Sequence, residues 1–144
     1  MKNIGQRGFT LIELLIVITI IAILASLILN AAGYAQKKGA RSRAEAEIAA
    51  VGAALENYKA DNGDYPSNST VANCANLVSS LMPSSGKVYF EFKSKFTNSS
   101  GWLDPFGNTY GYIYTNGSPN NGANNFDLWS TAGGGASNTW IRNW

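Results

Sequence analysis

The most restrictive feature of the chain is one long apolar run near its start, "FTLIELLIVITIIAILASLIL", from Phe9 to Leu29. As an α-helix, these 21 residues would be roughly 31 Å long, which is about the thickness of the hydrocarbon core of a membrane. The run contains one charged residue, Glu13. A charge in the hydrocarbon costs about 2.5–3.5 kcal/mol on insertion scales, so we expect the chain to provide this carboxylate with a partner.

The rest of the composition is typical of a small water-facing domain. The chain has 144 residues, a formal net charge of +2 and no histidine. It lacks the strongly basic character of nucleic-acid-binding proteins, so no nucleic-acid partner is expected. The single cysteine, Cys74, excludes an intramolecular disulfide and is expected to be a small buried residue.

An ordinary secretory signal is one interpretation of the N-terminal segment, because a basic start precedes an apolar run. Three features argue against it. The run exceeds the usual length of about 7–15 residues, it contains an acid near its start, and the best small-residue cleavage site, around Ala31, comes late. The apolar segment is therefore predicted to stay in the mature protein.

The stretch "RGFTLIELLIVITIIAILA" resembles the type IV prepilin signature, which type IV pilins share with the pseudopilins of type II secretion systems. The resemblance rests on Gly8, Phe9, Thr10, Leu11 and Glu13, together with the aliphatic run that follows. It implies that a prepilin peptidase cleaves between Gly8 and Phe9 and methylates the new amino group of Phe9. Residues 1–8 are then a leader that is removed.

The resemblance also implies a role for Glu13, which in this family pairs with the amino terminus of a neighbouring subunit during assembly. Cleavage would place a positive amine on Phe9, four residues before Glu13 and roughly 6 Å away along a helix axis. A stagger of one helical turn between two copies would bring the two charges together, and pairing offsets much of the burial penalty. The alternative is an unpaired carboxylate that reaches the membrane surface.

The charges that flank the run do not by themselves favour the orientation known for the family. Lys2 and Arg7 precede the run, and four basic residues follow it: Lys37, Lys38, Arg41 and Arg43. A plain count favours a cytoplasmic C-terminus. The resemblance implies the opposite, a single-pass protein of the bacterial inner membrane whose C-terminal domain lies in the periplasm, and we follow it.

The helix is predicted to continue to about Ala60. Ile48, Val51, Leu55 and Tyr58 form one apolar stripe at helical spacing. Gly63 is placed to cap the helix, and Pro66 prevents its continuation. Gly33 and Gly39 each weaken a helix by about 1 kcal/mol relative to alanine, so bending or local melting is expected there.

Beyond the helix, the patterns predict a small antiparallel sheet. A short helix is expected within 71–82, and alternation in "KVYFEFKS" predicts a strand over 87–94. The "DPFG" segment, 104–107, favours a type I turn, and strands are expected within 108–115 and 124–130 around a polar loop, 116–125. Trp140, Ile141 and Trp144 are expected to hold the otherwise irregular C-terminal segment onto the sheet.

These elements define an α+β fold in which a long N-terminal helix packs on a small antiparallel β-sheet domain, as in pilins. The predicted organisation is a leader (1–8), a transmembrane or filament-core helix (9–30) and a globular domain (31–144). Within the globular domain, the amphipathic helix extends to about 62, a variable loop covers 63–86, and the sheet with its C-terminal loops covers 87–144.

Three further stretches, "ALENYKADNGDYPS", "DPFGNTYGYIY" and "FDLWS", resemble the major pseudopilins of type II secretion. That resemblance implies a structural calcium near the last strand, with Asp127 and Ser130 as candidate ligands. Few carboxylates lie nearby, so the alternative is a loop held by asparagine side chains. Tyr110, Tyr112 and Tyr114 share one strand face and are expected to pack in the sheet rather than to form a stacking surface for nucleic acids or sugars.

No catalytic constellation is visible, so we expect a non-enzyme. The family resemblance implies a helical homopolymer that drives protein export, with further partners in a prepilin peptidase, an inner-membrane assembly platform, its ATPase and minor pseudopilins. One alternative is a type IV pilin of a surface fibre for adhesion, twitching or DNA uptake. An alternative of another class is a secreted soluble binding domain released by ordinary signal cleavage.

Overall fold

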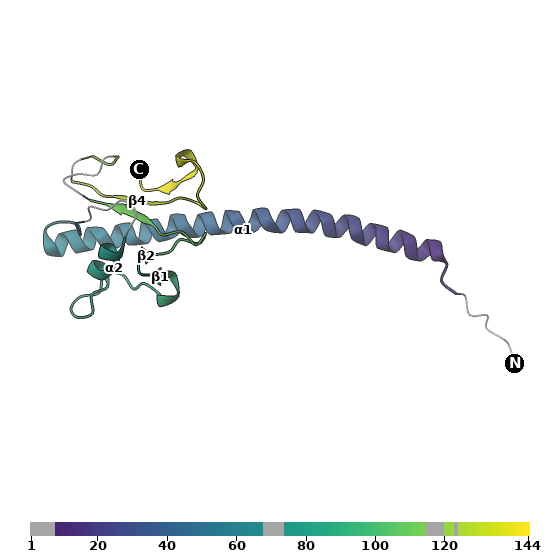
Figure 1. Cartoon of the computed structure of the whole chain (residues 1–144), viewed down its shortest axis with the longest axis horizontal. Coiled ribbons are helices and arrows are strands. Elements are labelled where there is room, and N and C mark those ends of the chain that lie inside the picture. Colours follow the sequence, from purple (N-terminus) through teal and green to yellow (C-terminus); the bar gives the residue numbers. More distant parts are fainter. Residues whose placement is uncertain (1–7, 68–73, 115–119, 123) are drawn as a thin grey trace. The chain divides into compact units, whose positions relative to one another are not determined.

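The computed structural model describes residues 8–67, 74–114, 120–122 and 124–144 (Figure 1). The chain divides into two compact units, the first ending at Lys38 and the second covering Gly39–Trp144. Helix α1, Leu11–Asn62, contributes residues to both. The sequence-based boundary at residue 30 marks the end of the apolar run, whereas the structural division marks where α1 begins to pack against the rest of the chain.

In the first unit, no other described segment covers α1. Every large apolar side chain from Leu11 to Leu29 is exposed, from 48% at Val17 to 89% at Leu11. Helix formation here depends on backbone hydrogen bonds and on a composition free of glycine and proline, and not on a tertiary partner. Among the described residues, α1 is the one helix long and apolar enough to cross a membrane, and an 18-residue stretch of it has a mean hydropathy of 3.0.

The second half of α1 is amphipathic, as predicted. Val51 and Leu55 are fully buried, Ile48 is nearly so, and Tyr58 packs at the edge of the core. The helix ends at Asn62, and Gly63 follows with a φ of 87° while its N–H donates to the carbonyl of Lys59. This is the glycine cap expected from the sequence. The local melting expected at Gly33 and Gly39 is not observed: α1 continues through both residues without a break.

A three-stranded antiparallel sheet covers one side of this half of α1 (Figure 1). Its order is β3 (Gly111–Ile113), β4 (Asp127–Ser130) and β5 (Ile141–Arg142). Tyr112 lies opposite Leu128, and Ser130 lies opposite Ile141. The sequence predicted β3 and β4 but not β5, because β5 has only two residues and follows a glycine-rich segment.

On the other side of α1 lie the short helix α2 (Ala75–Leu81) and a hairpin of β1 (Thr97–Asn98) and β2 (Gly101–Trp102) (Figure 1). Two 3₁₀ turns, η1 (Ser94–Phe96) and η2 (Ser137–Thr139), complete the described elements. Leu77 and Leu81 of α2 and Trp102 of β2 join the same core as the sheet residues. The architecture is the predicted α+β arrangement.

The prediction of a strand over 87–94 is wrong. The backbone N–H groups of Tyr89 and Phe90 both donate to the carbonyl of Leu81, at the end of α2, and not to a neighbouring strand. The N–H of Phe92 points at the sulfur of Met82. The segment is irregular, and its alternating apolar residues do not share one buried face: Phe92 is buried, whereas Val88 is exposed.

Two glycines allow the core to close where no side chain would fit. A Cβ on Gly111 would lie 2.1 Å from the Trp129 ring. A Cβ on Gly101, whose φ is 122°, would lie 2.5 Å from the sulfur of Cys74. That sulfur accepts a hydrogen bond from the N–H of Trp102 at 3.0 Å. Cys74 is the small buried residue expected from the sequence, and burial raises the pKa of its thiol.

Candidate functional site: the start of α1 and the loop before β4

The start of α1 is built by reciprocal hydrogen bonds between Thr10 and Glu13. The N–H and the hydroxyl of Thr10 donate to Oε2 of Glu13 at 2.8 Å and 2.7 Å. In return, the hydroxyl oxygen of Thr10 accepts from the N–H of Glu13 at 3.3 Å. This is a capping box, which satisfies N–H groups that the first helical turn would leave unpaired. The carboxylate also lies at the positive end of the helix dipole.

Our sequence reasoning missed this local role of Glu13, although the spacing was visible. The segment "TLIE" has threonine and glutamate three residues apart, directly before an apolar run, which is the pattern of a capping box. The partner that the structure provides for Glu13 therefore lies in the same chain. Both threonine donors use Oε2, and no bond to Oε1 is recorded among the described residues. The pairing of Glu13 with a neighbouring subunit stays a prediction.

Gly8 and Phe9 lie immediately before this cap. Both residues are exposed and non-helical, and Phe9 is 85% exposed. Apart from its chain neighbours, no described residue has an atom within 4 Å of the position that a Cβ on Gly8 would occupy. The peptide bond between the two residues is therefore an accessible, irregular backbone segment of the kind that proteases cleave. Lys2 and Arg7 of the predicted leader lie outside the described residues.

The loop before β4 is organised around Asp127, which is fully buried. Its Oδ2 accepts hydrogen bonds from the side-chain amide of Asn120 at 2.6 Å and from the N–H of Asn120 at 3.3 Å. Its Oδ1 accepts from the N–H of Asn121 at 3.2 Å. These bonds neutralise much of the desolvation cost of the buried carboxylate.

Ser130, the second candidate ligand, is also fully buried but has a different partner. Its hydroxyl donates to Oδ2 of Asp104 at 2.6 Å and accepts from the N–H of Ala132 at 3.0 Å. Oδ1 of Asp104 accepts from the N–H groups of Phe106 and Asn108 at 3.0 Å and 2.8 Å. Among the described residues, the hydrogen bonds of Asp127 and those of Ser130 have no partner in common. Side chains alternate along a strand, so positions 127 and 130 point to opposite faces of β4.

Asp104 is a structural residue that the candidate ligand set did not contain. It opens the predicted "DPFG" turn, and the turn bond from the N–H of Gly107 to the carbonyl of Asp104 is present at 3.0 Å. The same carboxylate then connects the turn to β4 through Ser130. An aspartate at the first position of a turn is a signal for side-chain to backbone bonding, and that signal was available in the sequence.

The described oxygen atoms around Asp127 do not form the ligand set of a calcium site. Calcium takes six to eight oxygen ligands, whereas both oxygens of Asp127 face N–H donors. Within the described residues, no three histidine, cysteine, aspartate or glutamate side chains gather in a way that could hold a metal ion. Residues 115–119 and 123 of the same loop lie outside the described residues, so the calcium prediction stays a prediction.

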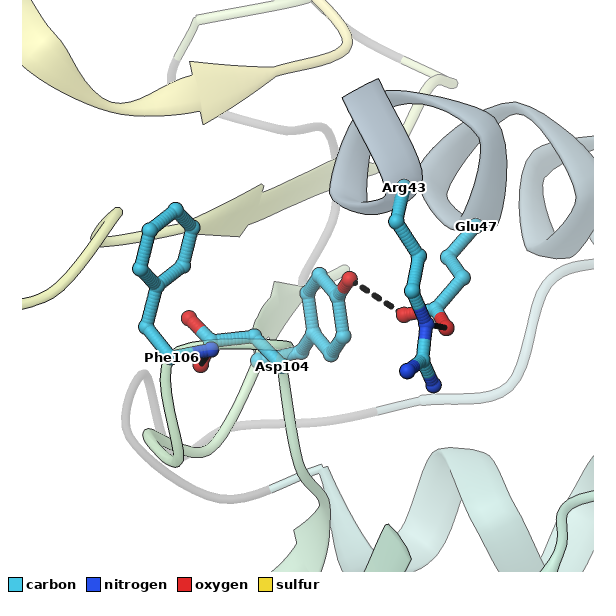
Figure 2. A network of polar contacts seen from close by, with 5 residues as sticks. Arg43, Glu47, Asp104 and Phe106 are labelled. Atoms are coloured by element: carbon cyan, nitrogen blue, oxygen red, sulfur yellow. Dashed lines mark hydrogen bonds and ion pairs between the residues drawn. The ribbon is translucent and has the colours of Figure 1, made fainter. Parts of the chain in front are cut away.

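The sheet is joined to α1 by tyrosine hydroxyls. Tyr110 donates to Oε2 of Glu47 at 2.7 Å, and Arg43 pairs with the other oxygen of Glu47 at 2.8 Å. Figure 2 shows Arg43 and Glu47 on neighbouring turns of α1. Asp104 and Phe106 lie nearby, in the loop that contains the "DPFG" turn. Burial and the bond to Glu47 raise the pKa of Tyr110, so the phenol stays protonated and donates.

The other two tyrosines of this face bond to the segment that follows α1. Tyr112 donates to the carbonyl of Pro66 at 2.8 Å, and Tyr114 donates to the carboxylate of Asp64. Tyr110, Tyr112 and Tyr114 are all buried. The prediction that they pack in the sheet is confirmed, and their rings offer no exposed stacking surface.

These features define a pilin-like class of protein. Its members combine an exposed apolar helix, here with a capped glutamate at its start, with a small α+β domain. Known families agree with this description. Residues 4–29 match the family described as "Prokaryotic N-terminal methylation motif". Residues 32–144 match the family described as "Type II secretion system (T2SS), protein G". The chain belongs to the type II secretion system protein G family, whose members are pseudopilins.

Curated relatives carry the same description. The type II secretion system core protein G of Escherichia coli is 33% identical over 110 residues, covering 73% of this chain and 70% of that protein. The Pseudomonas aeruginosa core protein G is 33% identical over 118 residues, covering 78% and 77%. The Pectobacterium carotovorum core protein G is 44% identical over 62 residues, covering 43% and 40%. The chain thus spans less than half the length of some relatives that it matches. No solved structure gives a significant match.

Proposed function

We propose that this protein is a structural subunit of a type II secretion pseudopilus, which polymerises through the first part of α1 to support protein export. The single observation that carries the proposal is the uncovered apolar helix Leu11–Leu29 with a capped glutamate at its start, in a chain of the protein G family. The described part of the chain offers no layer that covers these side chains. They require lipid before assembly and other copies of the same helix afterwards.

The geometry at Glu13 supports a specific assembly step. Cleavage between Gly8 and Phe9 would leave the capping box intact, because Thr10 and Glu13 both stay in the mature chain. Thr10 would hold the carboxylate through Oε2, leaving Oε1 to accept the methylated ammonium of Phe9 from a neighbouring copy. A charge-assisted bond in a low-dielectric bundle is strong, and it also selects the stagger between subunits.

The remaining parts of the proposal follow from the family. The methylation motif supports processing by a prepilin peptidase. We infer that the second unit lies on the periplasmic side of the bacterial inner membrane, and that an assembly platform with its ATPase and minor pseudopilins build the fibre. The protein itself would act as a structural element and not as an enzyme.

The test replaces Glu13 with alanine and, separately, with glutamine. Both variants should insert into the membrane and lose the leader at Gly8 normally. Fibre yield, measured by shearing cells that carry the secretion system and blotting the fibres, should fall about tenfold or more, because a buried ammonium loses its partner. Glu13→Gln retains an oxygen that accepts from Thr10, so it separates the loss of charge from the loss of the cap.

Glu45→Gln is the matched control. Glu45 is another carboxylate on α1, but it is solvent-exposed and pairs with Arg41 at 3.3 Å, and such surface pairs contribute little. Its fibre yield should equal that of the wild type. Wild-type yield from Glu13→Gln would refute the charge pairing, and a native protein that begins well past Leu29 would refute the filament function itself. Long surface fibres would instead favour a type IV pilin.

A further inference from the structure

Asparagine side chains hold together the segment that leads into β4. Besides the bonds that converge on Asp127, the amide of Asn121 donates to the carbonyl of Phe126 at 2.8 Å. The amide of Asn125 donates to the carbonyl of Asn121 at 3.1 Å. These bonds connect one part of the loop to another, so side-chain amides of the loop satisfy backbone carbonyl groups of the same loop.

A second clamp comes from the C-terminal segment. The amide nitrogen of Asn143 donates to the carbonyl of Phe126 at 3.0 Å, and its amide oxygen accepts from the N–H of Leu128 at 2.9 Å. The loop base is thus bonded from both sides. Across the described part of the chain, no buried side-chain nitrogen or oxygen lacks a hydrogen-bond partner. The arrangement therefore leaves no buried side-chain group whose bonding requires an ion.

A positive charge is already fixed beside the loop. The ammonium of Lys59, in the last turn of α1, donates to the carbonyl of Asn124 at 3.1 Å and lies 4.2 Å from the centre of the Tyr65 ring. Asn124 has a φ of 72°, a left-handed conformation that needs local support in a residue other than glycine. Backbone carbonyl oxygens in loops are also typical calcium ligands.

We propose that in this protein the asparagine amides and the ammonium of Lys59 hold together the described part of the loop before β4, residues 120–122 and 124–127, in place of the divalent cation that the family resemblance implies. Lys59 would supply the positive charge, and Asp127 would receive N–H donors on both oxygens. The stability of the domain would then not depend on calcium. This inference does not rest on filament assembly, and its test separates the two.

The experiment measures thermal unfolding of the full chain in detergent micelles by tryptophan fluorescence, because all four tryptophans lie in the second unit. The Tm should be the same in excess EGTA and in millimolar calcium. Lys59→Met should lower the Tm by about 4–8 °C in both solutions, which corresponds to the loss of one charge-assisted hydrogen bond. Lys59→Arg retains the charge and should recover most of the loss.

Lys93→Met is the matched control, because Lys93 is exposed and, among the described residues, its ammonium makes no hydrogen bond or ion pair. Its Tm should match the wild type. A Tm that falls in EGTA and is restored by calcium would overturn the proposal. A Lys59→Met variant no less stable than Lys93→Met would overturn the role of the lysine. Neither result depends on whether fibres form.

Discussion

The two parts of α1 differ in what surrounds them, although they belong to one helix. From Leu11 to Leu29 the apolar side chains point in all directions and are exposed. After Gly39 the large apolar residues lie along one stripe, where Val51 and Leu55 are fully buried together with Ala44. The second part is stabilised by its own domain. The first part has no such support within the described residues, and under the proposed function it would depend on lipid or on other copies.

The largest expected effect tests this difference directly. Leu55→Ala removes a fully buried side chain and should lower the free energy of unfolding of the second unit by about 2–5 kcal/mol. Ile21→Ala makes the same kind of truncation where the side chain is exposed, and it should leave that unfolding unchanged in detergent. Denaturant titration followed by tryptophan fluorescence measures both. Equal destabilisation by the two variants would remove the distinction between the regions.

A smaller effect is expected from the bond that connects the sheet to the second part of α1. Tyr110→Phe removes the hydroxyl that donates to Glu47 and should lower the free energy of unfolding by about 1–3 kcal/mol. Tyr34→Phe is the control, because Tyr34 belongs to the first unit and is exposed. Both variants are compared with the wild type in the same denaturant titration. An unchanged Tyr110→Phe variant would show that Arg43 alone satisfies Glu47.

The smallest expected effect depends on pH. The hydroxyl of Tyr114 and the N–H of Tyr65 donate to Asp64 and lower the pKa of that carboxyl. A lowered pKa stabilises the folded state above the unfolded value of about 3.9, and this stabilisation is lost as the pH falls through the folded pKa. The Tm of Tyr114→Phe should therefore lie below the wild-type Tm at pH 6, and the gap should narrow at about pH 3. A gap of constant size would assign the effect to packing.

The failed strand over 87–94 shows a limit of pattern reading. Alternation of apolar residues requires only that successive side chains face opposite directions, and an irregular segment can satisfy this as well as a strand. Here the N–H groups of Tyr89 and Phe90 are taken by the carbonyl of Leu81. That choice depends on where α2 ends in space, which local sequence does not specify.

The candidate sites show the same limit. The capping box at Thr10 and Glu13 spans three residues, and its spacing alone would have predicted it. The bond between Ser130 and Asp104 joins residues 26 positions apart. It requires the turn and β4 to be packed together before either side chain has a partner. The separate environments of Asp127 and Ser130 could therefore not be read from the "FDLWS" segment.

The sequence by itself determined the long helix, its division into an apolar and an amphipathic part, the glycine cap, the "DPFG" turn and the family. The family is indicated by the resemblance of whole motifs, and the other features depend on local propensity and on periodicity along a few turns of chain. Only the tertiary structure decided the path of 87–93, the pairing of β5 with β4, and the partners of the buried carboxylates Asp104 and Asp127. These depend on contacts between distant segments, where each polar group bonds to whichever donor the packing of the core brings within reach.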